Sequence, residues 1–409
     1  MKLQFKNSIT PAATPKPFHV DHFMPRGPSL LRQPQQLQPS GPEPETQSGI
    51  PGEGLPKALN YYADYGGCGL WRMVWPEMLL NGYQKAVINS LTVMVPIPNI
   101  YGTLDAVRIQ RQASAQQYQF AEFLASQAKQ YKFNLIYEID DIIFPEDIPI
   151  YNMCRDGFID PKLKENVTRI ISMCNKFSVV SPYMRDYYAD KLNIDPQKII
   201  ALPNYAPKFW LDRFYDHAQR MDNYARNKKK PRIGYCGSGT HFDVANRTLY
   251  NDDFSHVAQA VISTIDKFQW VFLGGLPPAL KPYLQSGKVE LFDWAPIYDY
   301  PAKMAELNLN AVVAPLAKNH FNNAKSNIKI TEAGALGIPG VFQDLPCYQS
   351  LDVVRFTTGE EMVMRLLELL KDEQSYSNAV IACRKIAEAN WLENHLDEHI
   401  KLFFDKSNT

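Results

Sequence analysis

APLAKNHFNNAKSNIKITEAGALGIPGVFQD, at residues 314–344, is the stretch that decides the expected fold of the second half of the chain. The apolar run at residues 307–315 predicts a buried parallel strand that leads into a polar loop. A helix should open after residues 325–327 and end at Gly337, before a short apolar strand. The stretch therefore predicts a strand–helix–strand unit of a parallel α/β sheet.

The charged residues of this helix have a spacing that suits an anionic ligand. Lys329 and Glu332 are three positions apart, so both side chains can face one cleft. A helix N-terminus attracts phosphate, a lysine adds a point charge for a diphosphate, and a carboxylate can accept hydrogen bonds from two ribose hydroxyls. We expect Gly334 and Gly337 to keep side chains away from the ligand. The alternative is an ordinary surface helix with one Lys–Glu pair.

Composition indicates a two-domain enzyme. The 409 residues are 45% hydrophobic and 12% aromatic, which is enough to bury two cores. The formal net charge is zero, so nucleic acid would have to be bound by a local basic patch rather than by total charge. The six cysteines form no C-x-x-C motif and predict reduced thiols instead of a metal site. Neither a signal peptide nor an apolar run of about 18–20 residues is present, so we expect a cytoplasmic protein without stable membrane insertion.

Alternating strand and helix patterns divide the chain into five parts. Residues 1–55 are rich in Pro and Gln, which predicts a disordered tail or, alternatively, a partner-docking arm. Residues 56–219 and 231–388 each predict a Rossmann-like α/β domain, joined by a charged linker at residues 220–230. Residues 389–409 predict a final helix that crosses back over both domains. Two right-handed β-α-β halves should face each other across a cleft lined by their strand ends.

Several polar residues of the first domain lie where ligands bind in such sheets. The glycine-rich turn at Gly67 and Gly69 allows backbone N–H groups to approach a ligand, although it lacks the full G-x-G-x-x-G spacing. Asp140 and Asp141 follow an expected strand at residues 133–137, where carboxylates can serve as a base, bind a metal or cap the next element. The Gln- and Ala-rich residues 110–130 predict a helix.

The first loop of the second domain also carries candidate ligand contacts. Gly237-Ser238-Gly239-Thr240 directly follows an expected strand, and Gly274 ends the next strand. His241 in this loop could contact a phosphate or a sugar hydroxyl, or it could hydrogen-bond the backbone. We expect Asp243 to cap the following turn, and Trp294 to pack near a base or in the core.

These motifs resemble those of nucleotide-sugar glycosyltransferases of the GT-B fold. In the second half the resemblance rests on Gly237-Ser238-x-Thr240-His241-x-Asp243, Ala314-Pro315-Leu316, Lys325-Ser326-x-x-Lys329-x-x-Glu332 and Gly337-x-Pro339. In the first half it rests on Gly67-x-Gly69-x-x-Arg72, Tyr137-Glu138-x-Asp140-Asp141 and Leu202-Pro203-Asn204. It covers about residues 60–404.

The resemblance implies a role for each matching residue. The first domain would hold the acceptor, and the second would hold the nucleoside-diphosphate sugar, a co-substrate that replaces any cofactor. The donor contacts implied in this way are Gly67, Gly69, Arg72, Gly237, Ser238, Gly239, Thr240, Gly274, Lys325, Ser326, Lys329 and Glu332. The catalytic candidates are Lys325, Lys329, Asp140, Asp141 and His241.

One departure from the family pattern affects the expected mechanism. Many retaining members carry a glutamate eight positions before the ribose-binding one, and here that position is Ala324. We still favour retention without a metal, because Lys325 and Lys329 can neutralise the leaving diphosphate. Inversion would need a base near the acceptor, for which Asp64, Asp140 and Asp141 are the candidates.

Three functions remain open at this point. The first is transfer of a sugar to the hydroxyl of a glycan or small molecule. The second is a phage-type enzyme that modifies hydroxymethylated pyrimidines in DNA, for which the basic residues 226–230 offer a local patch. The third is a sugar-nucleotide-binding protein without catalysis, a possibility suggested by Ala324 at the position where many retaining members carry a glutamate. The donor base, the sugar and the oligomeric state do not follow from the sequence.

Overall fold

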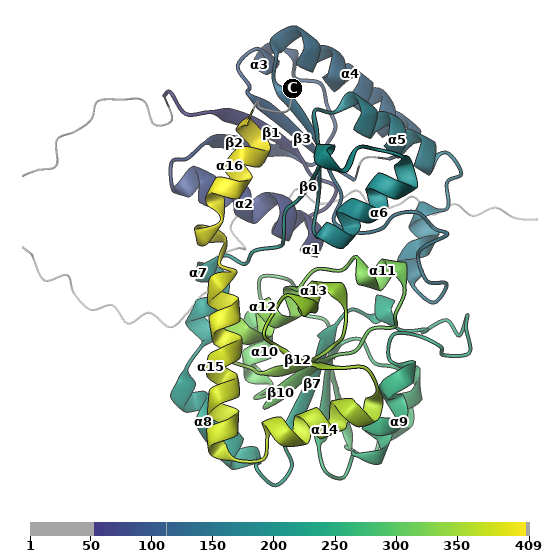
Figure 1. Cartoon of the computed structure of the whole chain (residues 1–409), viewed down its shortest axis with the longest axis vertical. Coiled ribbons are helices and arrows are strands. Elements are labelled where there is room, and N and C mark those ends of the chain that lie inside the picture. Colours follow the sequence, from purple (N-terminus) through teal and green to yellow (C-terminus); the bar gives the residue numbers. More distant parts are fainter. Residues whose placement is uncertain (1–52, 112, 406–409) are drawn as a thin grey trace, which may run out of the picture. The chain divides into compact units, whose positions relative to one another are not determined.

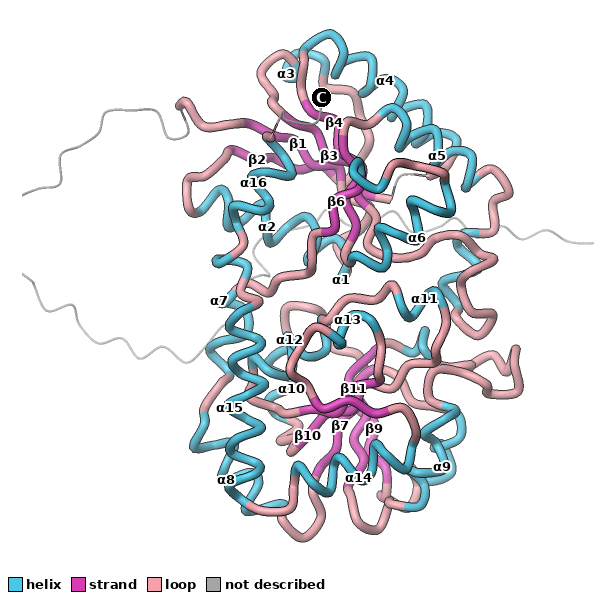
Figure 2. Tube along the Cα trace, viewed as in Figure 1, coloured by secondary structure: helices cyan, strands magenta, loops and turns pink. Residues whose placement is uncertain are grey.

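The computed structural model describes residues 53–111 and 113–405, and the expected tail at residues 1–55 lies almost wholly outside them. The described chain forms two parallel six-stranded sheets (Figure 1). Helices flank both sheets (Figure 2). This arrangement is the GT-B fold that the sequence predicts.

The first sheet has the strand order β2-β1-β3-β4-β5-β6. Its strands are β1 (Lys57–Tyr61), β2 (Val87–Leu91), β3 (Ala106–Gln110), β4 (Asn134–Glu138), β5 (Lys176–Val179) and β6 (Ile199–Ala201). The α-helices of this half are α1 (Gly67–Gly69), α2 (Trp75–Gly82), α3 (Pro98–Tyr101), α4 (Ala115–Tyr131), α5 (Leu163–Met173), α6 (Pro182–Leu192), α7 (Lys208–Leu211) and α8 (His217–Asn227). A π-helical segment (Leu70–Val74) joins α1 to α2, and 3₁₀ turns lie at Met153–Phe158, Pro196–Lys198 and Asp212–Phe214.

The second sheet has the order β12-β11-β10-β7-β8-β9. Its strands are β7 (Arg232–Gly237), β8 (Gln269–Gly274), β9 (Val289–Phe292), β10 (Ala311–Ala314), β11 (Gly340–Gln343) and β12 (Val354–Phe356). Its α-helices are α9 (Ser255–Ser263), α10 (Tyr300–Glu306), α11 (His320–Asn323), α12 (Ile328–Ala335), α13 (Pro346–Gln349), α14 (Gly359–Leu369) and α15 (Glu373–Ala389), with 3₁₀ turns at Gly239–His241 and Pro278–Tyr283. The strand order is that of a dinucleotide-binding sheet, and it reverses direction between β7 and β10, where ligands bind in such folds.

A buried charge cluster fixes the strand ends of the first sheet. Glu138, at the end of β4, is fully buried and accepts hydrogen bonds from Arg72 Nε (2.6 Å) and from Arg108. Burial alone would raise the pKa of Glu138, but the two guanidinium groups outweigh it and hold the pKa below its usual range. Arg72 also donates to the carbonyl of Leu202 (2.5 Å). The cluster therefore ties the helix after the glycine turn to β4 and to the segment after β6.

The chain returns to the first sheet at its end. After α15, which packs against α12 of the second half, a 3₁₀ turn (Leu392–Asn394) leads into α16 (Leu396–Phe404) (Figure 1). Lys176 of β5 donates from Nζ to the carbonyls of Lys401 and Leu402 (2.9 and 2.8 Å), which belong to the last turn of α16.

The structure differs from two expectations. Residues 106–110 form the inner strand β3, whereas we expected a helix from residue 110. Most of the expected linker lies within α8, residues 217–227, and its role as a linker stays a prediction. Gly334 and Gly337 face protein atoms instead: a side chain at Gly334 would collide with the Cys383 carbonyl of α15, and one at Gly337 would meet the ring of Tyr215. Gly334 therefore serves the packing of α12 against α15, and Gly337, with a positive φ of 67°, follows the end of α12 as expected.

We expect Gly334→Ala to destabilise the protein by about 1–3 kcal/mol, because the added methyl group would push α12 away from the backbone of α15. Gly82→Ala, at the end of α2, is the matched control, since no neighbouring atom lies within 4 Å of the position that its methyl group would take and alanine favours helix. Thermal unfolding measures both. A melting temperature of Gly334→Ala equal to that of Gly82→Ala would show that the close approach of α12 and α15 is wrong.

Candidate functional site

A cavity of about 300 Å³ lies where the strand ends of both halves meet. Its walls come from the segments after β1, β4 and β6 of the first sheet, and from β7, the segments after β7, β9 and β10, α12 and α13 of the second. The expected site residues that line it are Gly67, Asp140, Gly237, Ser238, His241, Lys325, Ser326, Lys329 and Glu332. The cavity thus lies at the point where the second sheet reverses its strand order, between β7 and β10.

Lys329 and Glu332 share one face of α12, as their spacing predicts. Lys329 Nζ lies 3.3 Å from Glu332 Oε2, and Tyr300 donates from its hydroxyl to the same oxygen at 3.2 Å. The Glu332 side chain is 6% exposed, whereas that of Lys329 is 34% exposed. The carboxylate is therefore held in place by two donors, while the ammonium group keeps access to the cavity.

Lys325 makes an ion pair with a residue of the first half. Its Nζ lies 2.7 Å from Asp141 Oδ2 and 4.0 Å from the centre of the Phe321 ring. Burial lowers the pKa of Lys325, but the attraction and the hydrogen bond of Asp141, together with the nearby Cys68 and Asp253, outweigh burial and raise the pKa above the ordinary value. Asp141 does not line the cavity itself. It neutralises a cation that does.

Two neutral contacts lie beside this ion pair. Asn204 of the first half donates from Nδ2 to Ser326 Oγ at 3.0 Å, and Ser181 donates to the carbonyl of Ala324 at 3.2 Å. The side chain of Ala324 is fully buried among apolar residues of the first half. The position where a retaining relative would carry a glutamate is therefore part of a packed contact between the two halves.

His241 is held by a carboxylate that we did not expect from the sequence. Its Nδ1 lies 2.8 Å from Asp253 Oδ2, and Asp253 is almost completely buried. Asp253 Oδ1 accepts from the Tyr151 hydroxyl (2.6 Å), from Asn322 Nδ2 (2.5 Å) and from the backbone N–H of Ala317 (2.9 Å). Burial would raise the pKa of Asp253, but its hydrogen-bond donors outweigh burial and lower it.

The glycine turn of the first half is shaped by Asp64. Its Oδ1 accepts from the backbone N–H of Gly66 (2.7 Å) and of Gly69 (3.3 Å), and its other oxygen pairs with Arg111. Arg111 Nε in turn lies 3.5 Å from Asp140 Oδ1. Both carboxylate oxygens of Asp64, an expected candidate for the base, are therefore occupied by structural contacts.

Several expected donor contacts do not line the cavity. Arg72 is buried in the cluster around Glu138, and Gly69 has no room for a side chain beside the Asp64 carbonyl. Asp243 accepts from the backbone N–H groups of Arg247 and Thr248 at 2.7 Å each, so its expected capping role is confirmed. Gly239, Thr240 and Gly274 also lie outside the lining.

Gly274 instead packs against Trp294, which lines the cavity. It has a positive φ of 96°, and a side chain there would collide with the ring of Trp294. Trp294 is 54% exposed and borders the cavity. Trp71, Tyr235 and Tyr348 are further aromatic lining residues that the sequence motifs did not identify.

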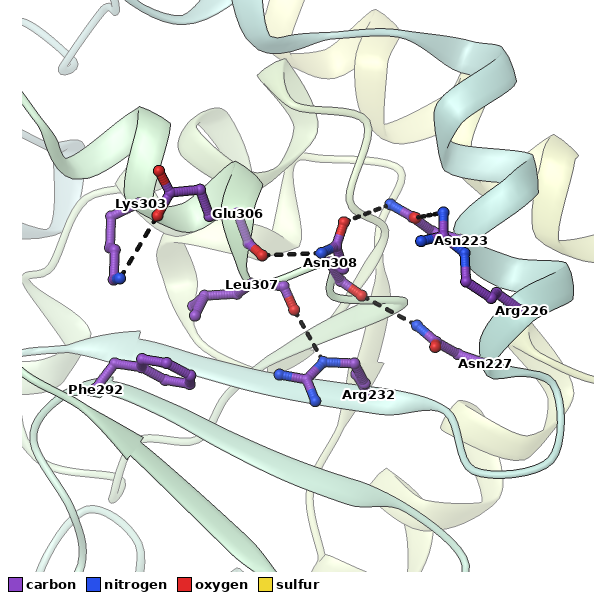
Figure 3. Close-up of a pocket in the computed structure, with 9 residues that line it drawn as sticks. All are labelled: Asn223, Arg226, Asn227, Arg232, Phe292, Lys303, Glu306, Leu307 and Asn308. Atoms are coloured by element: carbon purple, nitrogen blue, oxygen red, sulfur yellow. Dashed lines mark hydrogen bonds and ion pairs between the residues drawn. The ribbon is translucent and has the colours of Figure 1, made fainter.

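A second polar cavity, of about 420 Å³, lies elsewhere on the second half (Figure 3). Its polar groups are already paired with one another. Lys303 Nζ lies 3.5 Å from Glu306 Oε2, and Arg232 donates from Nε to the Leu307 carbonyl and from Nη1 to Glu290. Asn223 donates to Asn308 Oδ1 at 3.0 Å. The cations Lys303 and Arg232 of this cavity are therefore both paired with carboxylates.

All six cysteines are free thiols. Among the described residues, no group of three His, Cys, Asp or Glu side chains is arranged to hold a metal ion. No helix in the described part of the chain is long and apolar enough to cross a membrane.

No protein-family model matches the sequence, and no curated protein matches it. Solved structures match the fold. HepE of Anabaena in complex with UDP has a TM-score of 0.55 at 10% identity, covering 85% of this chain and 98% of that one. A glycosyltransferase from Rickettsia africae has a TM-score of 0.56 with the same identity and coverage. An α-glucosyltransferase in complex with UDP-glucose and DNA containing an abasic site has a TM-score of 0.53 at 10% identity, covering 85% of this chain and all of that one. At this identity the likeness establishes the GT-B fold.

We expect Asp141→Asn to bind inorganic pyrophosphate about three- to tenfold more tightly than the unchanged protein, because the carboxylate no longer competes with the anion for Lys325. Isothermal titration calorimetry measures the affinity. Asp186→Asn is the control, since Asp186 is exposed on α6 and pairs with Arg185. Equal or weaker pyrophosphate binding by Asp141→Asn would contradict a role for Lys325 in anion binding.

Proposed function

We propose that the protein is a glycosyltransferase that moves a sugar from a nucleoside-diphosphate sugar to an acceptor hydroxyl. One observation carries the proposal: Lys329 and Glu332 lie 3.3 Å apart on α12 and line a cavity at the strand-order reversal of a dinucleotide-type sheet. The GT-B fold supports it, and so do similar structures that contain UDP or UDP-glucose.

The donor would be held mainly by the second half, residues 231–388. Lys325 and Lys329 would meet the diphosphate, and the backbone N–H groups beside Gly237 and Ser238 would add neutral donors. Glu332 would accept hydrogen bonds from the ribose hydroxyls, since a carboxylate can accept several at once. Its low exposure and its contact with Tyr300 keep it oriented before the donor arrives.

The reaction would break the bond between the anomeric carbon and the diphosphate oxygen and form a bond to the acceptor oxygen. Negative charge develops on the leaving diphosphate, and Lys325 and Lys329 are the cations of the cavity that can stabilise it. We propose retention of configuration without a metal, with the acceptor proton passing to the departing phosphate oxygen. Asp64 is less suited as an inverting base because both its oxygens are engaged.

The acceptor would occupy the first half, residues 56–219. A cavity of about 700 Å³ lies there at the carboxyl ends of β1, β2 and β3, where the first sheet also reverses its strand order. Its charged side chains, Asp64 and Arg111, pair with each other, and the rest of its lining is apolar or neutral, including Val93, Val95 and Gln117. This lining suits an uncharged acceptor.

DNA is a second candidate acceptor. The observation in its favour is the fold match to the α-glucosyltransferase whose structure contains DNA. A polyanion would need free cations beside the acceptor cavity, whereas Arg111 is paired with Asp64 and Asp140. An acceptor screen that includes hydroxymethylated duplex DNA and neutral glycosides decides between the two.

We expect Lys329→Ala and Glu332→Ala each to weaken donor binding at least tenfold and to abolish transfer, with little change in melting temperature. Glu332→Ala should also lose discrimination between a ribonucleoside diphosphate and its 2′-deoxy analogue, because the carboxylate accepts from the ribose hydroxyls. Calorimetry with the donor found by a thermal-shift screen of nucleotide sugars measures both effects.

Lys303→Ala and Glu306→Ala are matched controls for this experiment. They form an ion pair of the same i,i+3 spacing on α10 but line the other polar cavity (Figure 3). If both site variants keep the donor affinity of these controls, the assignment is refuted. Donor binding without transfer or hydrolysis in the unchanged protein would instead indicate a binding protein without catalysis.

The proposed retention predicts that product and donor share one anomeric configuration. Proton NMR of the product formed at early times measures the coupling constant of the anomeric proton and so identifies the configuration. A product of the opposite configuration would exclude retention and would make Asp140 the candidate base, because it lines the donor cavity.

A further inference from the structure

We infer that Asp253 is a positioning residue: it fixes the ring of His241 so that Nε2 is a hydrogen-bond acceptor in the cavity for a hydroxyl group of the sugar that the donor carries. The inference rests on the proposed function for the identity of the donor. The arrangement of the ring follows from contacts of the protein alone.

The four donors around Asp253 determine which nitrogen of His241 carries a proton. Oδ1 accepts from three of them, Tyr151, Asn322 and the backbone N–H of Ala317, and Oδ2 faces His241 Nδ1 at 2.8 Å. Burial would raise the pKa of Asp253, but the contact with His241 and the hydrogen bonds from Tyr151 and the Ala317 N–H outweigh burial and hold the pKa below its usual range, so the group is a carboxylate and can only accept. Nδ1 must therefore carry the proton.

The other ring nitrogen is then left for a ligand. His241 lines the cavity together with Ser238, Lys329 and Glu332. In the described part of the chain, Nε2 has no hydrogen-bond partner. A neutral ring with a proton on Nδ1 presents a lone pair at Nε2, which accepts from a hydroxyl and repels a phosphate oxygen. Asp253 is the charged group that contacts the ring, and Asp140, Lys325, Lys329 and Glu332 are the other charged residues that line the cavity with His241.

Tyr151 makes this arrangement depend on the first half of the chain. It belongs to the segment at residues 139–158, which follows β4 and meets the second half at two other points: Asp141 pairs with Lys325, and Asp156 accepts from Arg247 (3.0 and 2.6 Å). Asp253 therefore receives hydrogen bonds from both halves, and only the bond from His241 leads to the cavity.

Asp253→Asn tests the inference without changing the shape of the side chain. Three donors converge at the Oδ1 position, so the amide oxygen should lie there and the amide NH₂ should face Nδ1. Nδ1 must then accept, and the proton moves to Nε2. Tyr151→Phe is the matched control, because it removes a donor from the same carboxylate but keeps the bond to His241.

Long-range proton–nitrogen NMR of protein labelled with ¹⁵N-histidine shows which ring nitrogen is protonated, with His241→Gln identifying the signals. We expect a protonated Nδ1 and a bare Nε2 in the unchanged protein and in Tyr151→Phe, and a bare Nδ1 with a protonated Nε2 in Asp253→Asn. A bare Nδ1 or a protonated Nε2 in the unchanged protein overturns the inference whether or not the protein is a glycosyltransferase.

Calorimetry tests the ligand. Asp253→Asn should bind the nucleotide sugar roughly three- to tenfold more weakly, and the sugar-free nucleoside diphosphate within about twofold of the unchanged protein. In a His241→Ala background, the same substitution should have no further effect beyond about twofold. Equal loss for both ligands, tighter binding, or additive effects would refute the role of Asp253. If the unchanged protein binds no nucleotide sugar, the proposed function fails, and the NMR result still decides the ring.

Discussion

Two lysine–carboxylate pairs balance the charge of the cavity: Lys329 with Glu332 and Lys325 with Asp141. A cation in a partly buried site loses hydration, and a carboxylate partner offsets that loss only where the geometry is good. A diphosphate brings its own negative charge, so it competes with both carboxylates for the lysines. Glu332 lines the cavity, so its oxygens can accept from a ligand hydroxyl in the orientation that Tyr300 already holds. Asp141 lies outside the lining, and its contact with Lys325 joins the two halves of the chain. Binding of the proposed donor would therefore be linked to the contact between the halves through one ammonium group.

The contact between Lys325 and Asp141 requires that the strand ends of the first half are held in fixed positions. Asp140 and Asp141 follow Glu138, which is buried between Arg72 and Arg108 at the end of β4. Removing either guanidinium would leave a buried carboxylate with less compensation, which is the costly case for interior charge. The cluster therefore does more than fill the core. It fixes the direction in which the chain leaves β4, and so it places the carboxylate that meets Lys325.

The parts of this structure that are predictable from sequence are those in which the chemistry is local. The spacing of Lys329 and Glu332 predicts their shared face, and the apolar runs predict most strands of both sheets. The end of the inner strand β3 was wrongly expected to be helix. Its polar residues Arg108 and Gln110 are fully buried, and no local sequence pattern indicates that burial. Arg72 matched a motif, yet its partners are Glu138 and residues after β6, far away in the chain. Asp253 and Tyr151 are separated by about a hundred residues and meet only after folding. Contacts of this kind depend on the tertiary structure and leave no spacing to detect.

A chain of charged side chains connects the linings of the two cavities at the strand ends. Asp64 pairs with Arg111, which in turn reaches Asp140 at 3.5 Å. Asp64 and Arg111 border the cavity of the first half, and Asp140 borders the cavity that also holds Lys325 and Lys329. Under the proposed function, a sugar that passes from a donor in one cavity to an acceptor in the other would pass close to this chain. Its hydroxyl groups would then lie near carboxylates that can accept hydrogen bonds and near a guanidinium that cannot lose its proton. That asymmetry favours a polar, uncharged group in transit and disfavours an anionic one.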